Sequence, residues 1–199
     1  MRLWPRSGRK LLKNPTAQIP LDKANLAIYD KVKTAPELAG MGTTIIAAYI
    51  QEDALWWVSV GDSPLWLFRN GTGRRLNQNQ SVAGILDQQV AAGEITAAQA
   101  ARRPGRSRLL EAVMGARIKM IDAPDISLPV RAGDVLVLAS DGVETCSLAE
   151  LGDIVSGHSG SAQALVQDIL DAVESHEEPY QDNATVIVLQ LQDFVVMET

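Results

Sequence analysis

The sequence contains a single cysteine, Cys146, among its 199 residues. One thiol excludes a disulfide framework within the chain and a zinc site built from several cysteines. Cys146 lies in a polar turn before a serine that reads as a helix cap, so we expect a small packed side chain and not a nucleophile. His158 and His176 fall in a Gly/Ser loop and at the end of a predicted helix, and neither is assigned a catalytic role.

Long apolar runs and basic stripes are also missing. No apolar stretch is long enough to cross a bilayer, and no Lys/Arg stripe is interleaved with aromatic residues. The net charge of -6 gives no attraction to nucleic acid or to anionic membranes. The basic segment 1–13 is not followed by the apolar stretch and cleavage site of a secretory signal. We therefore predict a cytoplasmic protein that binds neither nucleic acid nor membrane.

The composition, with 46% hydrophobic residues, is typical of one globular domain. Residues 1–20 show no helical or strand-like hydrophobic period, and they contain Pro5, Pro15 and Pro20. This predicts an irregular basic arm over residues 1–20. The remainder, residues 21–199, is expected to form the domain.

Periodicity indicates which elements this domain contains. Apolar residues at helical spacing predict helices over 22–34, 81–90, 147–155 and 161–176, and a short one after Thr96. Runs rich in β-branched and aromatic residues predict strands over 43–50, 54–60, 65–69, 119–128, 135–139 and 185–191. Pro124 confines the 119–128 candidate to a sheet edge or interrupts it. We expect the first three strands to form an antiparallel meander, a hairpin at Asn70-Gly71, and a further helical turn or two over 108–114. The pattern indicates an α+β fold.

Three aspartates stand at the ends of strand-like runs. They are Asp62, after the run 54–60; Asp141, after the run 135–139; and Asp182, just before the last strand. Each could be an ordinary turn residue. Carboxylates delivered by strands to one edge of a sheet are also the ligands that hard divalent cations prefer.

Four motifs carry a resemblance to a known family. In order, they are Gly-Met-Gly-Thr-Thr at 40–44, Val-Gly-Asp-Ser at 60–63, Ala-Ser-Asp-Gly-Val at 139–143 and Asp-Asn-Ala-Thr-Val-Ile at 182–187. Together they resemble the motif series of the metal-dependent protein Ser/Thr phosphatases of type 2C. The helical insert at about 81–115 is similar to the flap of the bacterial members.

This resemblance implies a fold, a cofactor and a reaction. The fold is two antiparallel β-sheets sandwiched between helices, and the reaction is hydrolysis of phosphoserine or phosphothreonine in proteins by a metal-activated water. By position, Asp141 and Asp182 match ligands of a central Mg²⁺ or Mn²⁺ pair. Asp62, together with Asp141, matches the site of a third, weaker ion. Asn183 is expected to orient its neighbour's carboxylate by a hydrogen bond.

The chain departs from the family at three places. The family's Asp-Gly-x-Gly-Gly element is absent, since the only Asp-Gly is Asp141-Gly142. Pro64 replaces an Arg of many relatives, and Asn-Gln-Ser at 79–81 replaces Asp-His-Ser. The absent element predicts an N-terminally truncated member without its opening strands, whose exposed sheet edges a partner or a second copy covers. The other two departures lie on the flap side and concern substrate contacts more than metal binding.

Three functions remain open at this point. The first is a phosphatase that acts on phosphoproteins, and the second is a catalytically dead relative that binds phosphoproteins or a regulatory protein. The third is a serine hydrolase using Ser63 or Ser140, which the absence of a Gly-x-Ser-x-Gly element disfavours.

Overall fold

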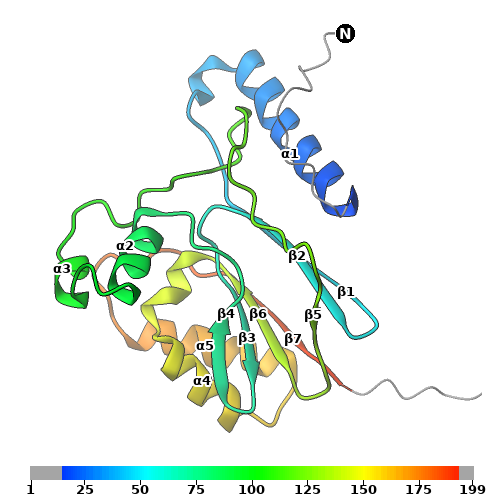
Figure 1. Ribbon diagram of the computed structural model, residues 1–199, viewed down its shortest axis with the longest axis vertical. Helices are drawn as coiled ribbons and strands as arrows, with labels where there is room; N and C mark the ends of the chain where they lie inside the picture. The colour runs from blue at the N-terminus through cyan, green and yellow to red at the C-terminus, as the bar shows by residue number, and fades with distance from the viewer. Residues whose placement is uncertain (1–14, 193–199) are drawn as a thin grey trace, which may run out of the picture.

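Two antiparallel sheets form the centre of the molecule. Figure 1 shows the computed structural model, which describes residues 15–192 and, for 15–19, the backbone alone. The helices are α1 (Pro15–Thr34), η1 (Pro36–Leu38), α2 (Val82–Ala91), α3 (Ala97–Ala101), η2 (Asp141–Thr145), α4 (Leu148–Gly157) and α5 (Ala162–Ser175). The strands are β1 (Ile45–Gln51), β2 (Ala54–Val60), β3 (Leu65–Arg69), β4 (Thr72–Arg75), β5 (Leu128–Pro129), β6 (Val135–Ala139) and β7 (Val186–Gln190). Strand orders β1-β2-β5 and β4-β3-β6-β7 confirm the predicted α+β fold with two antiparallel sheets.

The two sheets share one core, and helices cover the outer face of the four-stranded sheet. Leu67 of β3 and Leu136 of β6 pack with Leu55 of β2 between the sheets. Trp66 and Phe68 of β3 point the other way, into a cluster that α4 and α5 close. Because both faces of β3 are covered, its sequence reads as a continuous apolar run and not as an alternating one.

Helix α1 packs against one end of the three-stranded sheet and corrects one expectation. The predicted irregular arm is wrong from Pro15 to Pro20, because these residues are helical; residues 1–14 of that arm lie outside the described part. Proline is tolerated at the first helical position, where the missing N–H has no partner anyway, but Pro20 removes an internal hydrogen bond. Leu21, which is 3% exposed, packs against Val58 and Val60 of β2. We attribute the continued helix to this packing.

The predicted meander is only half right. Strands β1 and β2 pair along their whole length, but β3 pairs with β4 and β6 in the other sheet. The turn Gly61–Pro64 carries the chain across, with Gly61 at a φ of 103° that a residue with a side chain rarely adopts. The predicted hairpin at Asn70-Gly71 is confirmed, since it joins β3 to β4 with φ values of 50° and 75°.

Two further expectations concern the long connection before β6, and the first of them is wrong. Residues 108–114 form no helix; Leu109 and Val113 instead make isolated bridges to Ser81 and Thr43. The strand candidate 119–128 is interrupted: residues 119–127 make one isolated bridge, between Asp122 and Ser59, and Leu128 pairs with Leu55 at the start of β5. Pro124 lacks the N–H that a continued ladder needs.

The helix caps follow the sequence closely. Ser81, Thr96, Ser147 and Ser161 each accept a hydrogen bond from a backbone N–H in the first turn of α2, α3, α4 and α5. None of the helices within residues 15–192 combines the length and the apolarity that crossing a bilayer requires.

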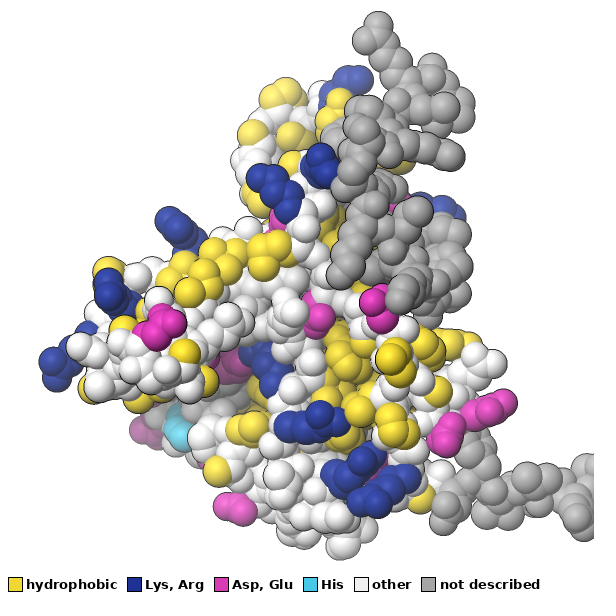
Figure 2. Space-filling model, viewed as in Figure 1, with side chains coloured by type: hydrophobic (Ala, Val, Ile, Leu, Met, Phe, Trp, Pro, Cys, Tyr) yellow, Lys and Arg dark blue, Asp and Glu magenta, His cyan; other side chains and the backbone are white. Residues whose placement is uncertain are grey.

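The surface is mixed in character. On the face shown in Figure 2, Lys and Arg side chains are scattered among acidic and apolar ones and do not form a continuous stripe. Within the described residues, no strand pairs with the outer edges of β1 and β7. Tyr49 on β1 and Ile187 on β7 are 49% and 55% exposed. A partner or second copy across these edges stays a prediction.

The core between the sheets predicts a stability difference between two leucines. Leu67→Ala, at a side chain 1% exposed, should lower the free energy of unfolding by about 2–5 kcal/mol, since it leaves a cavity between the sheets. Leu26→Ala on α1, at a side chain 55% exposed, is the matched control and should change it by no more than about 0.5 kcal/mol. Urea denaturation measures both. Equal losses would contradict the shared core.

Candidate metal centre

The fold brings the three predicted aspartate turns to one end of the sandwich. β6 runs antiparallel to both neighbours, with Leu138 opposite Leu65 of β3 and Ala139 opposite Val186 of β7. The end of β6 therefore lies beside the beginnings of β3 and β7. Asp141 follows the first, and Asp62 and Asp182 precede the other two.

Buried polar side chains hold the Asp62 turn in shape. Gly61 donates its N–H to Gln80 Oε1 at 2.8 Å, and Gly61 O accepts from the Gln80 N–H at 3.1 Å. Asn77 accepts from the Leu65 N–H at 2.8 Å and donates to Ser63 O at 2.9 Å. Asp62 is 7% exposed, so its carboxylate sits on a rigid and largely dry support.

The Asp141 and Asp182 turns are joined directly by backbone contacts. Gly142 lies so close to the neighbouring turn that a Cβ atom there would come within 2.6 Å of Asn183 O. Ser140 Oγ donates to Asn183 O at 3.1 Å and accepts from the Thr185 N–H at 2.9 Å. Gln181 adds a bond from Nε2 to Gly142 O at 2.8 Å. Two carboxylates are thus fixed in neighbouring turns.

The electrostatics of the site favour a cation. Burial raises the pKa of Asp62, and the charge of Asp141 raises it further. The hydrogen bond and the Arg75 charge that favour the ionised carboxylate therefore do not fully offset burial and the charge of Asp141. A divalent cation would remove this cost.

Glu144 and Arg75 belong to the same electrostatic group, and the sequence did not reveal them. Burial raises the pKa of Glu144, opposed by Arg75, while the charges of Asp62 and Asp141 add to the rise. Arg75 Nη1 bonds Glu144 Oε1 at 2.6 Å, and its Nη2 donates to Asp62 O. Glu144 lies three residues after Asp141, and this spacing could have indicated from the sequence that the two side chains lie near each other. Arg75 lies in a polar strand with no distinguishing pattern.

Asn183 contributes through its backbone. Its N–H donates to Asp182 Oδ1 at 2.8 Å, and its carbonyl accepts from Ser140. The predicted role of its side chain stays a prediction. Asp182 itself is exposed at the rim of the site.

The three aspartates offer oxygen ligands spread over two sides of Asp141. Among the described residues, one group of three ligand-type side chains has all its ligand atoms within 4.8 Å of one another, and the aspartates are not that group. The three aspartates therefore do not form one closed cage within the described part of the chain, and their role as metal ligands stays a prediction. Oxygen-only donors suit Mg²⁺ and Mn²⁺.

Comparisons with known proteins agree with this geometry. Residues 10–192 match the family model of stage II sporulation protein E. The serine/threonine protein phosphatase PstP of Mycobacterium tuberculosis is 29% identical over 176 residues, which are 85% of this chain and 31% of that protein. The chain therefore spans less than a third of the length of this relative.

Solved structures give the same result. The PPM Ser-Thr phosphatase MsPP of Mycobacterium smegmatis, in complex with cacodylate, has a TM-score of 0.65 at 29% identity, covering 85% of this chain and 70% of that one. The catalytic domain of PstP in complex with two manganese ions has a TM-score of 0.73 at 23% identity, covering 94% and 75%. At 23% identity, the similarity to this PstP structure establishes a shared fold and nothing finer.

The raised pKa of Asp62 predicts a pH-dependent gain from Asp62→Asn in metal-free protein. The folded state favours the protonated carboxyl, so the stabilisation is complete below the ordinary pKa of 3.8 and is lost as the pH rises through the raised value. The variant should therefore be more stable than wild type at pH 7, and the difference should vanish in acid. Chemical denaturation across this range measures it.

Adding Mn²⁺ should reverse the order at pH 7, because the ion stabilises the form that binds it better. Asp171→Asn, at an exposed position of α5, controls for the loss of one negative charge. A metal-free Asp62→Asn protein that is less stable than wild type at pH 7 would show that neighbouring groups already compensate the carboxylate.

Proposed function

Because the chain belongs to the bacterial PPM family of serine/threonine phosphatases, we propose that it hydrolyses phosphoserine and phosphothreonine in proteins with Mg²⁺ or Mn²⁺. The observation that supports this most is the pairing of Asp62 with Asp141 from separate turns, near enough for one charge to raise the other's pKa. Two like charges at this range disfavour each other, and a bound cation would offset that repulsion.

In this proposal Asp141 is the shared ligand. It stands between Asp182, across the contact at Gly142, and Asp62, across the end of β3. When bound, two divalent cations make a water nucleophilic and neutralise charge on the phosphoryl oxygens. The protein's own contribution is to hold the carboxylates in place before the substrate arrives, so that no reorganisation is needed.

Arg75 has a positioning role here. Its guanidinium is engaged by Asp62 O and by Glu144, which fixes the Asp62 turn against η2. Burial lowers the pKa of Arg75, and Glu144 and Asp62 oppose that shift. An arginine engaged in this way supports the acidic turns.

A cavity of about 450 Å³ adjoins this group, between α2 and η2. Its lining includes Arg75 and Arg106 with Asp87 and Glu144, and Trp66 forms part of its wall. We propose that this cavity accommodates the substrate residue next to the phosphorylated one. The mixed charges of its lining favour a polar side chain, and α2 belongs to the flap-like insert. The phosphoprotein substrate, the cytoplasmic location and an oligomer across the free strand edges remain predictions.

The decisive test is turnover by wild type and by Asp141→Asn. With Mn²⁺, wild type should hydrolyse a phosphothreonine peptide, and the variant should lose at least about a hundredfold in kcat/KM because several kcal/mol of charge stabilisation disappear. Asp171→Asn, on the outer face of α5, is the matched control and should keep wild-type activity.

Two results would contradict the proposal. Turnover that persists after chelation of divalent ions would exclude a metal-dependent mechanism. Calorimetric binding of the phosphopeptide without any turnover in Mn²⁺ would identify a phosphoprotein-binding module on the same fold, as the absent Asp-Gly-x-Gly-Gly element allows.

A further inference from the structure

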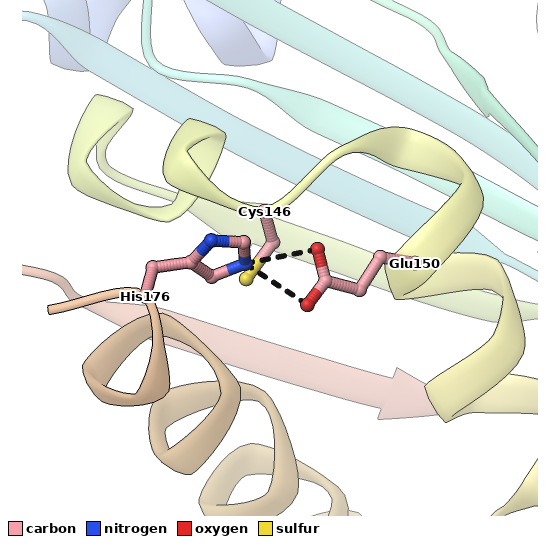
Figure 3. A group of neighbouring side chains, drawn as sticks. All are labelled: Cys146, Glu150 and His176. Carbon is pink, nitrogen blue, oxygen red and sulfur yellow. Dashed lines mark hydrogen bonds and ion pairs between the residues drawn. The ribbon is translucent and has the colours of Figure 1, made fainter. Parts of the chain in front are cut away.

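A second group of ligand-type side chains lies apart from the three aspartates. Figure 3 shows Cys146, Glu150 and His176 pointing toward one another from different elements. Their ligand atoms, one sulfur, one nitrogen and one carboxylate oxygen, all lie within 4.8 Å of one another. No two of the three residues are neighbours in the sequence.

The fold places each of them at an element end. Cys146 closes η2 and is 3% exposed, Glu150 lies in the first turn of α4, and His176 caps the end of α5. Ser147 starts α4 by accepting from the Glu150 N–H at 3.2 Å, which fixes Glu150 beside the cysteine. The packing of α5 against α4 and η2 brings His176 to the same point.

The distances between ligand atoms in this group are close to those between the ligands of one metal ion. His176 Nε2 lies 3.0 Å from both oxygens of Glu150. With bonds of about 2.0–2.3 Å to sulfur, nitrogen and oxygen, ligand atoms around a tetrahedral zinc lie roughly 3.3–3.8 Å apart. Small rotamer adjustments would therefore let all three atoms reach a single ion.

We propose that Cys146, Glu150 and His176 form a site for a borderline-soft divalent ion of the zinc class. The mixed sulfur, nitrogen and oxygen donors select such an ion over Mg²⁺ or Mn²⁺, which prefer oxygen alone. On binding, the thiol proton leaves to solvent and the thiolate sulfur bonds the ion. His176 and Glu150 are each about one third exposed, so the fourth position faces water.

Burial, and next the charge of Glu150, raise the pKa of the Cys146 thiol to about 11. Without a metal the thiol is therefore neutral at pH 7, and it acts as a packed side chain, as the sequence predicts. A bound cation would offset both causes. The hydrogen-bonded histidine–glutamate pair alone is the competing explanation, since it joins the first turn of α4 to the end of α5 without any ion.

The new site shares an element with the aspartate site but no ligand. Asp141 begins η2, and Cys146 follows its last residue. An ion held by Cys146 would fix one end of the short helix whose other end carries Asp141. The proposal does not depend on phosphatase activity and can fail or succeed independently of it.

Titration with Co²⁺ in the presence of excess Mg²⁺ tests the site, because Co²⁺ replaces zinc and bonding to a thiolate gives a charge-transfer band. Wild type and Asp141→Asn should both show this band, saturating at one ion per chain. Cys146→Ser should lose it, and His176→Gln should bind at least about tenfold more weakly. Zn²⁺ should displace the Co²⁺.

His158→Gln is the matched control, since His158 also contacts a carboxylate, Asp168, at 2.7 Å, and should bind as wild type does. If Cys146→Ser fails to fold, thermal melting decides: at one fixed concentration, Zn²⁺ should raise the Tm of wild type and His158→Gln by more than that of His176→Gln. Co²⁺ bound without a thiolate band, or an equal Zn²⁺ shift in His176→Gln, would overturn the proposal.

Discussion

The candidate metal centre depends on a backbone contact at Gly142. The end of β6 and the segment before β7 can approach only because residue 142 has no side chain; a Cβ atom would come within 2.6 Å of one carbonyl oxygen and 2.8 Å of the next. Those carbonyls belong to Asp182 and Asn183, so the contact sets the separation of the Asp141 and Asp182 turns. The sheet brings the strand ends together, but this contact decides whether two carboxylates share a site.

The same closeness carries an electrostatic cost. Asp62, Asp141 and Glu144 crowd one end of the sandwich, and Arg75 supplies the opposing charge named for both Asp62 and Glu144. The raised pKa values of Asp62 and Glu144 record that burial outweighs this compensation. Such a group favours either protonation or a bound cation. In the proposed function, cations would offset the repulsion at neutral pH without removing the charges.

Local chemistry made parts of this structure predictable. Asn70-Gly71 specifies a hairpin because both residues accept positive φ. The sequence also shows an aspartate at each strand boundary, but the three meet at one edge only because β6 runs antiparallel to β3 and β7. The crossing at Gly61–Pro64 was missed, since sequence proximity favours pairing of successive strands and only the core shows that β3 is covered on both faces. Helix α1 continues through Pro20 because tertiary packing outweighs one lost hydrogen bond. Arg75 and Glu144 meet across 69 residues, which no periodicity encodes.

Two groups of donors of different hardness flank the short helix η2. Oxygen donors alone gather at its Asp141 end, whereas sulfur, nitrogen and oxygen meet at its Cys146 end. A given site generally binds Zn²⁺ more tightly than Mn²⁺, so on both proposals the Cys146 group would draw zinc-class ions away from the aspartates. The sequence suggests no such division, because a lone cysteine and a helix-end histidine are usually inert. The packing of α4 against α5 makes them neighbours.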